Sequence, residues 1–154
     1  METEFTRTEL LLGKETLQTL AAKRVAIFGV GGVGGFACEA LARSGVGTLD
    51  LFDKDTVSIS NLNRQIIATY DTIDTYKVDA MKKRIMSINK NAVVNTHPVF
   101  YLPENANDYD FSEYDYVIDA VDTVTAKLEI VTQAKKAGVP VISAMGAGNK
   151  LDPT

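Results

Sequence analysis

Short apolar runs and amphipathic segments alternate along most of the chain. The apolar runs are rich in β-branched and aromatic residues and end at glycine or acidic residues, as buried β-strands do. The segments between them place apolar side chains three or four positions apart, which is the spacing of one face of a helix. We therefore predict strands over residues 24–30, 48–52, 92–99, 114–122 and 139–148, and helices over residues 10–22, 34–45, 75–89 and 125–138.

Each helical segment has an apolar side that we expect to point inward. Two of the helices should stop at Gly45 and Gly138, because glycine readily ends a helix. The apolar sides are Leu10, Leu17, Leu20 and Ala21 in the first segment, Phe36, Ala37, Ala40 and Leu41 in the second, and Val78, Met81, Ile85 and Ile88 in the third.

The alternation of strands and helices predicts the fold class. Strands separated by helices of about 10 to 15 residues indicate a parallel sheet covered on both faces. Because crossovers between parallel strands are right-handed, we predict an α/β fold with a Rossmann-like, doubly wound and mainly parallel sheet. Residues 1–22 would form an N-terminal helical arm, and residues 23–154 a nucleotide-binding domain. In such sheets ligands bind beyond the carboxyl ends of the strands. The residues expected at that edge are 29–34, 53, 119–122 and 146–148.

Composition narrows the classes of function. A chain of 154 residues, 45% of them hydrophobic, can form one compact domain. We expect no membrane span and no signal peptide, and the single cysteine and single histidine exclude a disulfide framework or a cysteine-rich zinc site within the chain. These features predict a cytoplasmic protein in which Cys38 and His97 are structural. The net charge of −4 argues against a broad nucleic-acid-binding surface, though not against a local basic patch.

The motif GVGGVG, residues 29–34, lies between a predicted strand and a predicted helix. Its glycines, Gly29, Gly31, Gly32 and Gly34, fit the pattern G-x-G-x-x-G. Gly31 and Gly32 would let the backbone approach a phosphate at the start of the helix, where amide donors and the helix dipole favour an anion. The alternative is a tight turn with a structural role only.

An acidic residue, Asp53, follows the next predicted strand and should accept hydrogen bonds from ribose hydroxyls. Asp55 either assists it or is a solvated residue that caps the turn. These two residues open a connection, residues 54–75, that is long for a compact domain, and such loops are usually functional.

The same loop contains the polar sequence NLNRQ, with Asn61, Asn63, Arg64 and Gln65. The planar guanidinium of Arg64 can hold phosphate oxygens, and Asn61 can donate to a phosphate or a ribose. An ordinary asparagine-rich turn is an equally good interpretation of these residues alone. Lys77 could add a second positive charge, although most single lysines are simply solvated.

The sequence DAVDTVTAK places Asp119 and Asp122 at the end of a predicted strand. Carboxylates beside phosphate oxygens are normal ligands of Mg²⁺, which makes Asp122 a candidate metal ligand. Asp122 could also cap the helix that begins near Thr123, and the two roles are compatible.

Together these motifs, in this order, resemble those of the ubiquitin-activating-enzyme-like adenylating superfamily (ThiF type). The resemblance runs from about Phe5 to the last residue. Within the superfamily the sequences N-x-N-R-Q, EALARSGVG and GAGNKLDPT are most similar to the tRNA threonylcarbamoyladenosine dehydratase branch. Relatives continue well past residue 154, so the present chain corresponds to their nucleotide-binding part.

The resemblance implies that ATP and Mg²⁺ bind and that AMP is transferred to a substrate carboxylate. It implies phosphate contacts from Asn61, Arg64 and Lys77, a ribose contact from Asp53, and metal positioning by Asp122. Catalysis would then depend on charge neutralisation by Arg64, Lys77, the metal and Arg7 rather than on a covalent nucleophile. In relatives the arginine that matches Arg7 reaches the partner subunit's ATP, which implies a homodimer. The implied substrate is tRNA.

Two other functions compete with this interpretation. An adenylyltransferase that activates a sulfur-carrier or ubiquitin-like protein would share every nucleotide motif. An NAD-dependent dehydrogenase would explain the glycine motif, but it would leave Arg64, Lys77 and Asp122 without a role.

Overall fold

A five-stranded parallel sheet is the centre of the fold. The computed structural model describes residues 2–144, and within them the strand order is β3-β2-β1-β4-β5. The strands are β1 (Arg24–Phe28), β2 (Thr48–Phe52), β3 (Val93–His97), β4 (Tyr116–Asp119) and β5 (Val141–Ser143). Every pairing in this sheet is parallel, which confirms the predicted doubly wound α/β fold.

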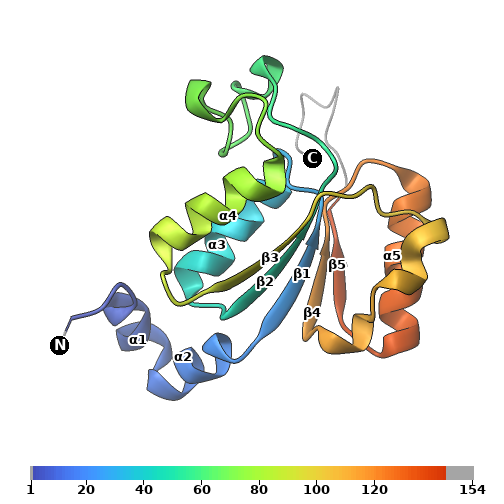
Figure 1. The fold of residues 1–154 in the computed structure, drawn as a ribbon. Coiled ribbons are helices and arrows are strands. Elements are labelled where there is room, and N and C mark those ends of the chain that lie inside the picture. The colour runs from blue at the N-terminus through green and yellow to red at the C-terminus, as the bar shows by residue number, and fades with distance from the viewer. Residues whose placement is uncertain (1, 145–154) are drawn as a thin grey trace, which may run out of the picture.

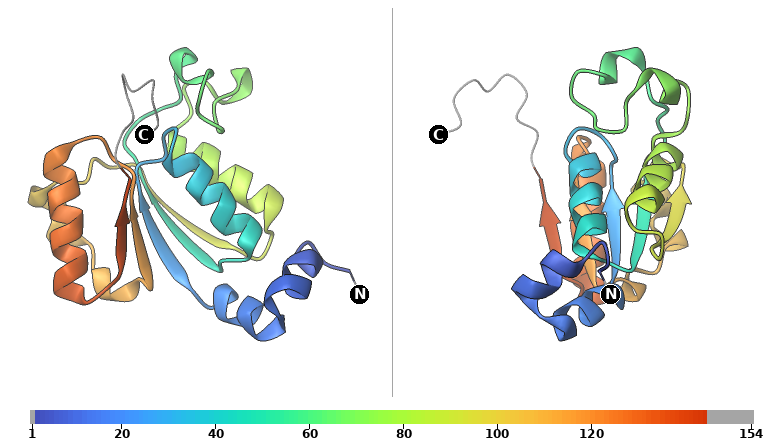
Figure 2. Two further views of the ribbon diagram at one scale, coloured as in Figure 1. Left: turned by 180° about the vertical axis from the view of Figure 1, so that it is seen from behind. Right: turned by 90° about the vertical axis from the view of Figure 1, so that its left-hand side faces the viewer.

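Helices cover both faces of the sheet. Helices α3 (Gly34–Ser44) and α4 (Lys77–Ile88) pack on one face, and α5 (Val124–Ala137) packs on the other (Figures 1 and 2). As predicted, α3 and α5 end at glycines with positive φ, 88° at Gly45 and 71° at Gly138. None of the helices within residues 2–144 combines the length and the apolar character needed to cross a membrane.

Alternate residues of β1 point to the two faces and join two separate apolar layers. Val25 and Ile27 belong to an aliphatic layer beneath α3 and α4. Ala26 and Phe28 belong to an aromatic layer beneath α5, in which Phe28 stacks on Phe52 at a ring-centroid distance of 4.3 Å. The aromatic layer extends toward the carboxyl ends of β1 and β2, where the predicted ligand edge lies.

The predicted inward face of α4 is confirmed, because Val78, Met81 and Ile85 are fully buried. The predicted face of α3 is only partly right: Leu41 packs against the core, but Ala40 is exposed and Phe36 is 54% exposed. The buried residues of this helix are Gly34, Gly35, Cys38 and Ala42. Gly34, the first residue of α3, has no room for a larger side chain, because a Cβ atom there would lie 1.8 Å from Gly29 O in the turn after β1.

The N-terminal segment forms two short helices instead of the single predicted helix. Helix α1 (Thr6–Leu12) and helix α2 (Lys14–Ala21) meet at Gly13, whose φ of 84° is incompatible with a continuous helix. The break turns the predicted apolar side outward at its start, so that Leu10 is 84% exposed. The two helices lead into β1 near the amino-terminal ends of the strands (Figure 1).

Cys38 and His97 have the structural roles that we predicted. Burial raises the pKa of the Cys38 thiol to about 12, so the thiol stays protonated. His97 has partners that the sequence did not indicate: its ring stacks on Phe52 at 4.2 Å, and its Nε2 atom lies 3.3 Å from Asp50 Oδ1.

Asp50 is a fully buried carboxylate in the middle of the sheet. Arg24 donates to both of its oxygens at 2.9 Å, and Asn95 Nδ2 donates at 3.2 Å. Burial by itself raises the pKa of Asp50, but the hydrogen bonds from Arg24, His97 and Asn95 and the charge of Arg24 outweigh it and bring the pKa to about 2.

The buried carboxylate of Asp50 should make the free energy of unfolding depend on pH. Because its folded-state pKa lies below the ordinary value near 3.9, its stabilising contribution is complete above about pH 4 and is lost as the pH falls toward 2. We expect Asp50→Asn to lower the free energy of unfolding by about 2 kcal/mol or more at pH 7, and the gap to wild type to narrow below pH 4. Urea unfolding followed by circular dichroism at several pH values measures this, with exposed Asp71→Asn as the control. A gap that stays constant with pH would contradict the assignment.

Candidate functional site

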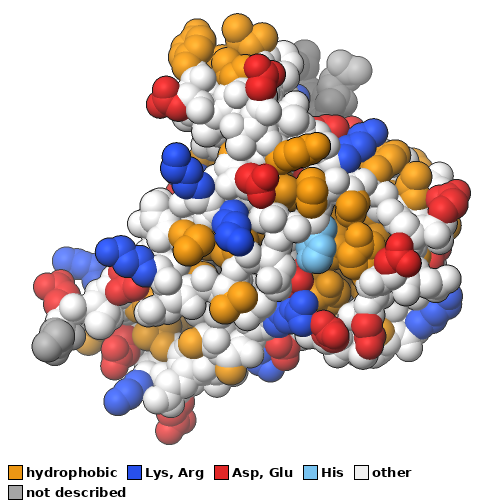
Figure 3. Space-filling view, viewed as in Figure 1, with side chains coloured by type: hydrophobic (Ala, Val, Ile, Leu, Met, Phe, Trp, Pro, Cys, Tyr) orange, Lys and Arg blue, Asp and Glu red, His pale blue; other side chains and the backbone are white. Residues whose placement is uncertain are grey.

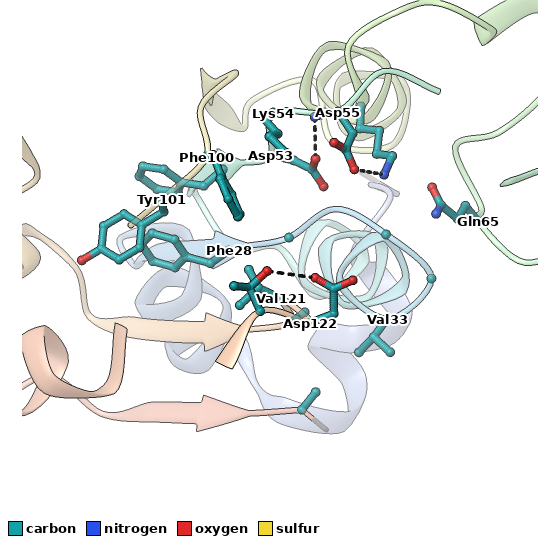
Figure 4. Close-up of a pocket in the computed structure, with 18 of the residues that line it drawn as sticks. Phe28, Val33, Asp53, Lys54, Asp55, Gln65, Phe100, Tyr101, Val121 and Asp122 are labelled. Carbon is teal, nitrogen blue, oxygen red and sulfur yellow. Dashed lines mark hydrogen bonds and ion pairs between the residues drawn. The ribbon is translucent and has the colours of Figure 1, made fainter. Parts of the chain in front are cut away.

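A cavity of about 880 Å³ lies at the carboxyl ends of β1, β2 and β4. Its position is the predicted one, next to the point between β1 and β4 where the strand order reverses. Its volume falls within the roughly 300–1,000 Å³ of small-molecule sites. Aromatic side chains lie toward one end of the site, and Asp55 and Gln65 lie toward the other (Figure 4). Residues 146–148, also expected at this edge, lie outside the described residues.

The glycine-rich loop between β1 and α3 forms one wall of the cavity. Gly29 has a φ of 87°, and a Cβ atom there would lie 2.7 Å from Ala120 O. A Cβ on Gly34 would lie 1.8 Å from Gly29 O, so these two glycines are required by the packing of the turn itself. Gly31 and Gly32 have no such constraint and line the cavity, while Gly34 does not. The tight turn and the predicted open approach for a phosphate therefore belong to different glycines of one motif.

Asp53 joins this loop to the end of β2. Its Oδ2 atom accepts a hydrogen bond from the amide of Val30 at 2.8 Å, and its Oδ1 atom accepts one from the amide of Asp55 at 2.9 Å. The carboxylate lines the cavity, as predicted, and it also fixes the position of the glycine-rich loop.

The connection after Asp53 folds back on itself before α4. Val57 donates its amide hydrogen to Thr75 O at 2.8 Å, and Lys77 donates its amide hydrogen to Asp55 O at 2.9 Å. The remaining loop contains two short 3₁₀ turns, Ile59–Asn61 and Tyr70–Thr72. These bonds explain how a long loop can hold polar side chains in fixed positions at the cavity.

Lys77 is not the solvated lysine expected from its residue type. It is only 7% exposed, and its Nζ atom lies 3.0 Å from Asp55 Oδ2. Asp55 is likewise an ion-pair partner rather than an isolated solvated acid, although its side chain is 53% exposed. Both residues line the cavity.

Arg64 and the two asparagines take distinct positions in the NLNRQ sequence. Arg64 lines the cavity, and its Nη1 atom donates to Ser60 O at 3.0 Å and to Asn63 Oδ1 at 2.9 Å. Asn63 is outside the cavity lining, so its contribution is to orient the guanidinium. Asn61 is buried and lines the cavity, and its Oδ1 atom accepts a bond from Ser58 N at 3.0 Å. The turn and the ligand-site interpretations are therefore compatible here.

The two acids of DAVD are separated by the structure. Asp122 is exposed at the cavity, where Thr123 Oγ1 lies 3.4 Å from its Oδ1 atom (Figure 4). The helix-cap alternative for Asp122 is wrong, because the N-cap of α5 is Thr123. Asp119 is buried outside the cavity lining, with Lys127 Nζ 3.0 Å from its Oδ2 atom and with Ser143 as a further partner.

The cavity also has an apolar end, which the sequence motifs did not indicate. Phe28 and Phe52 are the last residues of β1 and β2, and the others come shortly after β3 or β4. Apolar residues at the carboxyl ends of predicted strands could therefore have been proposed as part of the site. Phe100 also carries the ammonium of Lys54 above its ring, 4.0 Å from the centroid. The large apolar residues at this end are Phe28, Phe52, Val99, Phe100, Tyr101 and Val121. A ligand with a flat apolar group joined to an anionic group would match the two ends.

Arg7 lies at the opposite end of the sheet from this cavity. It is an exposed residue of α1, near the amino-terminal ends of the strands, whereas the cavity lies at their carboxyl ends (Figure 1). The structure therefore does not bring Arg7 to the cavity of its own chain.

Positive and negative side chains are interspersed on the face seen in Figure 3. Lysine and arginine side chains alternate there with aspartate and glutamate, and no broad basic area covers the described residues of this face.

The fold and the cavity define a Rossmann-like α/β domain with a cavity at the switch point of its sheet. The chain belongs to the ThiF family, whose sequence model matches residues 5–153.

Individual relatives match over nearly the whole chain. This chain is 50% identical over 151 residues to the tRNA threonylcarbamoyladenosine dehydratase of Bacillus subtilis. The match covers 98% of this chain and 59% of that protein. The chain is 39% identical over 150 residues to the Escherichia coli dehydratase of the same name, covering 97% of this chain and 56% of that protein. The crystal structure of E. coli TcdA in complex with ATP superposes with a TM-score of 0.93 at 38% identity, over 97% of this chain and 62% of that one. The chain thus spans between half and two thirds of the length of these relatives.

Proposed function

We propose that this chain is the ATP-binding part of a tRNA threonylcarbamoyladenosine dehydratase. One structural observation carries the proposal: a single cavity combines an open glycine loop, three cationic side chains (Lys54, Arg64 and Lys77) and an aromatic end. This arrangement favours a nucleoside triphosphate as the ligand over a dinucleotide such as NAD. The identity to proteins named as this dehydratase, 50% in one case, supports the particular reaction.

The residues present fit ATP. Gly31 and Gly32 line the cavity without a side chain and would let a phosphate approach their backbone, and Arg64, Lys77 and Asn61 would supply donors to the remaining phosphate oxygens. Asp53 would accept from the ribose, and the aromatic end would receive the base. The cavity contains Asp122 at a position where a carboxylate could hold Mg²⁺ beside phosphate oxygens.

Bound ATP would supply an α-phosphorus for attack by a substrate carboxylate, with pyrophosphate as the leaving group. Arg64 and Lys77 would neutralise the charge that develops, and the rigid loop would keep them in place. We further propose that the protein is a cytoplasmic homodimer, that Arg7 adds a positive charge to the partner's site, and that the substrate is tRNA. The location of Arg7 away from its own cavity supports a role in trans.

The decisive experiment supplies the full-length protein with ATP, Mg²⁺ and tRNA that carries threonylcarbamoyladenosine. We expect AMP to form and each modified adenosine to lose one water, as detected by mass spectrometry of the nucleosides. Omitting ATP is the control. Unchanged tRNA together with adenylation of a sulfur-carrier protein would overturn the dehydratase assignment. Calorimetry that detects binding of NAD but not of ATP would overturn both the dehydratase and the adenylyltransferase assignments.

A further inference from the structure

Asp55 occupies a junction between three parts of the cavity wall. Its amide donates to Asp53 Oδ1 at 2.9 Å, its carbonyl accepts from the amide of Lys77 at 2.9 Å, and its carboxylate accepts from Lys77 Nζ at 3.0 Å. Since Asp53 in turn accepts from Val30, hydrogen bonds run without a break from the glycine-rich loop to the first residue of α4. The sequence leaves two roles open for Asp55, assisting Asp53 or capping the turn as a solvated residue, whereas in the structure its carboxylate is directed toward Lys77.

Lys77 has two reasons to require a negatively charged partner. Its side chain is almost fully buried, and an ammonium removed from water is costly unless it is paired. It is also the first residue of α4, where the positive end of the helix dipole disfavours a cation, and the N-cap residue Tyr76 makes no side-chain cap bond. Asp55 is the carboxylate that forms a salt bridge with Lys77 within the described residues.

The bond between the two side chains can be exchanged at low cost. About half of the Asp55 side chain is exposed, so water can solvate its carboxylate when the ammonium leaves. The position of the Asp55 backbone does not depend on that bond, because its amide and carbonyl are held separately by Asp53 and by the amide of Lys77.

We propose that Asp55 is a positioning residue that holds the Lys77 ammonium at the cavity and yields it to the phosphates of the nucleotide. The inference rests on the proposed function to the extent that a polyphosphate binds here. It assigns Asp55 an effect opposite to that of a ligand. Its carboxylate competes with the phosphates for Lys77 and repels them, so it lowers the affinity for ATP. It also holds the Lys77 ammonium in position when no nucleotide is bound.

Asp55→Asn tests the inference, because asparagine keeps the size and a neutral acceptor but removes the competing charge. In the full-length protein we expect ATP to bind about three- to ten-fold more tightly by calorimetry, and inorganic tripolyphosphate to gain similarly. The affinity for adenosine should not change, because adenosine has no phosphate. Asp55→Ser is a second variant that should shift both phosphate ligands in the same direction.

Asp71→Asn, which removes an exposed acid of the same loop outside the cavity, is the matched control and should leave all three affinities unchanged. Weaker binding of both ATP and adenosine to Asp55→Asn would make Asp55 a ribose ligand and overturn the inference. Weaker binding of ATP only when Mg²⁺ is present would make it a metal ligand, and an unchanged ATP affinity would also overturn it. If the wild-type protein itself binds no ATP, the proposed function fails together with the inference.

Discussion

Arg64→Ala in the full-length protein is expected to lower ATP–pyrophosphate exchange by about 10²- to 10³-fold. The guanidinium lines the cavity, and two acceptors, Ser60 O and Asn63 Oδ1, hold its Nη1 atom. Such a pre-oriented cation stabilises a developing negative charge without further reorganisation, which is why its loss should affect the rate strongly.

The fold should survive this substitution. The Arg64 side chain is exposed, and backbone bonds hold the turn, with the amides of Arg64 and Gln65 donating to Asn61 O at 3.1 and 2.9 Å. The midpoint of thermal unfolding should therefore stay close to that of wild type. Arg43→Ala is the matched control, because Arg43 is an exposed arginine of α3 that pairs with Glu39 outside the cavity. Near-normal exchange in Arg64→Ala would contradict a phosphate role for this residue.

Gly34→Ala should have the largest effect on stability. Its new Cβ atom would lie 1.8 Å from Gly29 O and 3.3 Å from the Cβ atom of Ala120, so α3 would have to move away from the turn after β1. Forcing an atom into such a packed backbone costs about 3 kcal/mol or more, and the glycine-rich loop would move with the helix. Chemical denaturation should give the loss of stability directly, and calorimetry should detect weakened ATP binding.

The neighbouring glycine provides the control for this prediction. A Cβ on Gly35 would meet Ile66 Cγ2, the end of a side chain, at 3.3 Å. That contact can relax, and alanine favours a helix over glycine by up to about 1 kcal/mol. We expect Gly35→Ala to change stability by less than 1 kcal/mol in either direction, within that range. Equal losses of stability in Gly34→Ala and Gly35→Ala would show that the close approach at Gly34 does not require a glycine there.

The strand positions, the sheet class and the cavity edge could be predicted because they depend on periodic burial and on glycine at chain turns. The apolar side of α4 followed the same rule, since Val78, Met81 and Ile85 pack there by side-chain size. The rule failed in part at α3, where Gly34 lies against the backbone of the turn after β1 and Gly35 lies against Ile66, while Phe36 is exposed. Hydrophobic periodicity registers which side chains are apolar, and it does not register how near two backbones approach.

Pairing between charged groups was the other part that the sequence could not provide. Asp119 and Asp122 are three positions apart, yet the first lies at the end of β4 and is buried against Lys127, while the second lies beyond the strand at the cavity. Likewise, nothing in the local sequence connects Asp55 with Lys77, because their contact depends on the loop folding back across residues 55–77. Such partners are fixed by tertiary structure and not by spacing.

The bond between Asp53 and the amide of Val30 has a consequence for how ribose recognition can be measured. A substitution at Asp53 would release the glycine-rich loop and remove the expected sugar contact in one step, so a lost affinity would have two inseparable origins. Removing a hydroxyl from the ligand instead leaves the loop anchored. A comparison of ATP with its 2′-deoxy and 3′-deoxy forms would therefore assign each sugar hydroxyl to this carboxylate, which no exchange of the carboxylate itself can do.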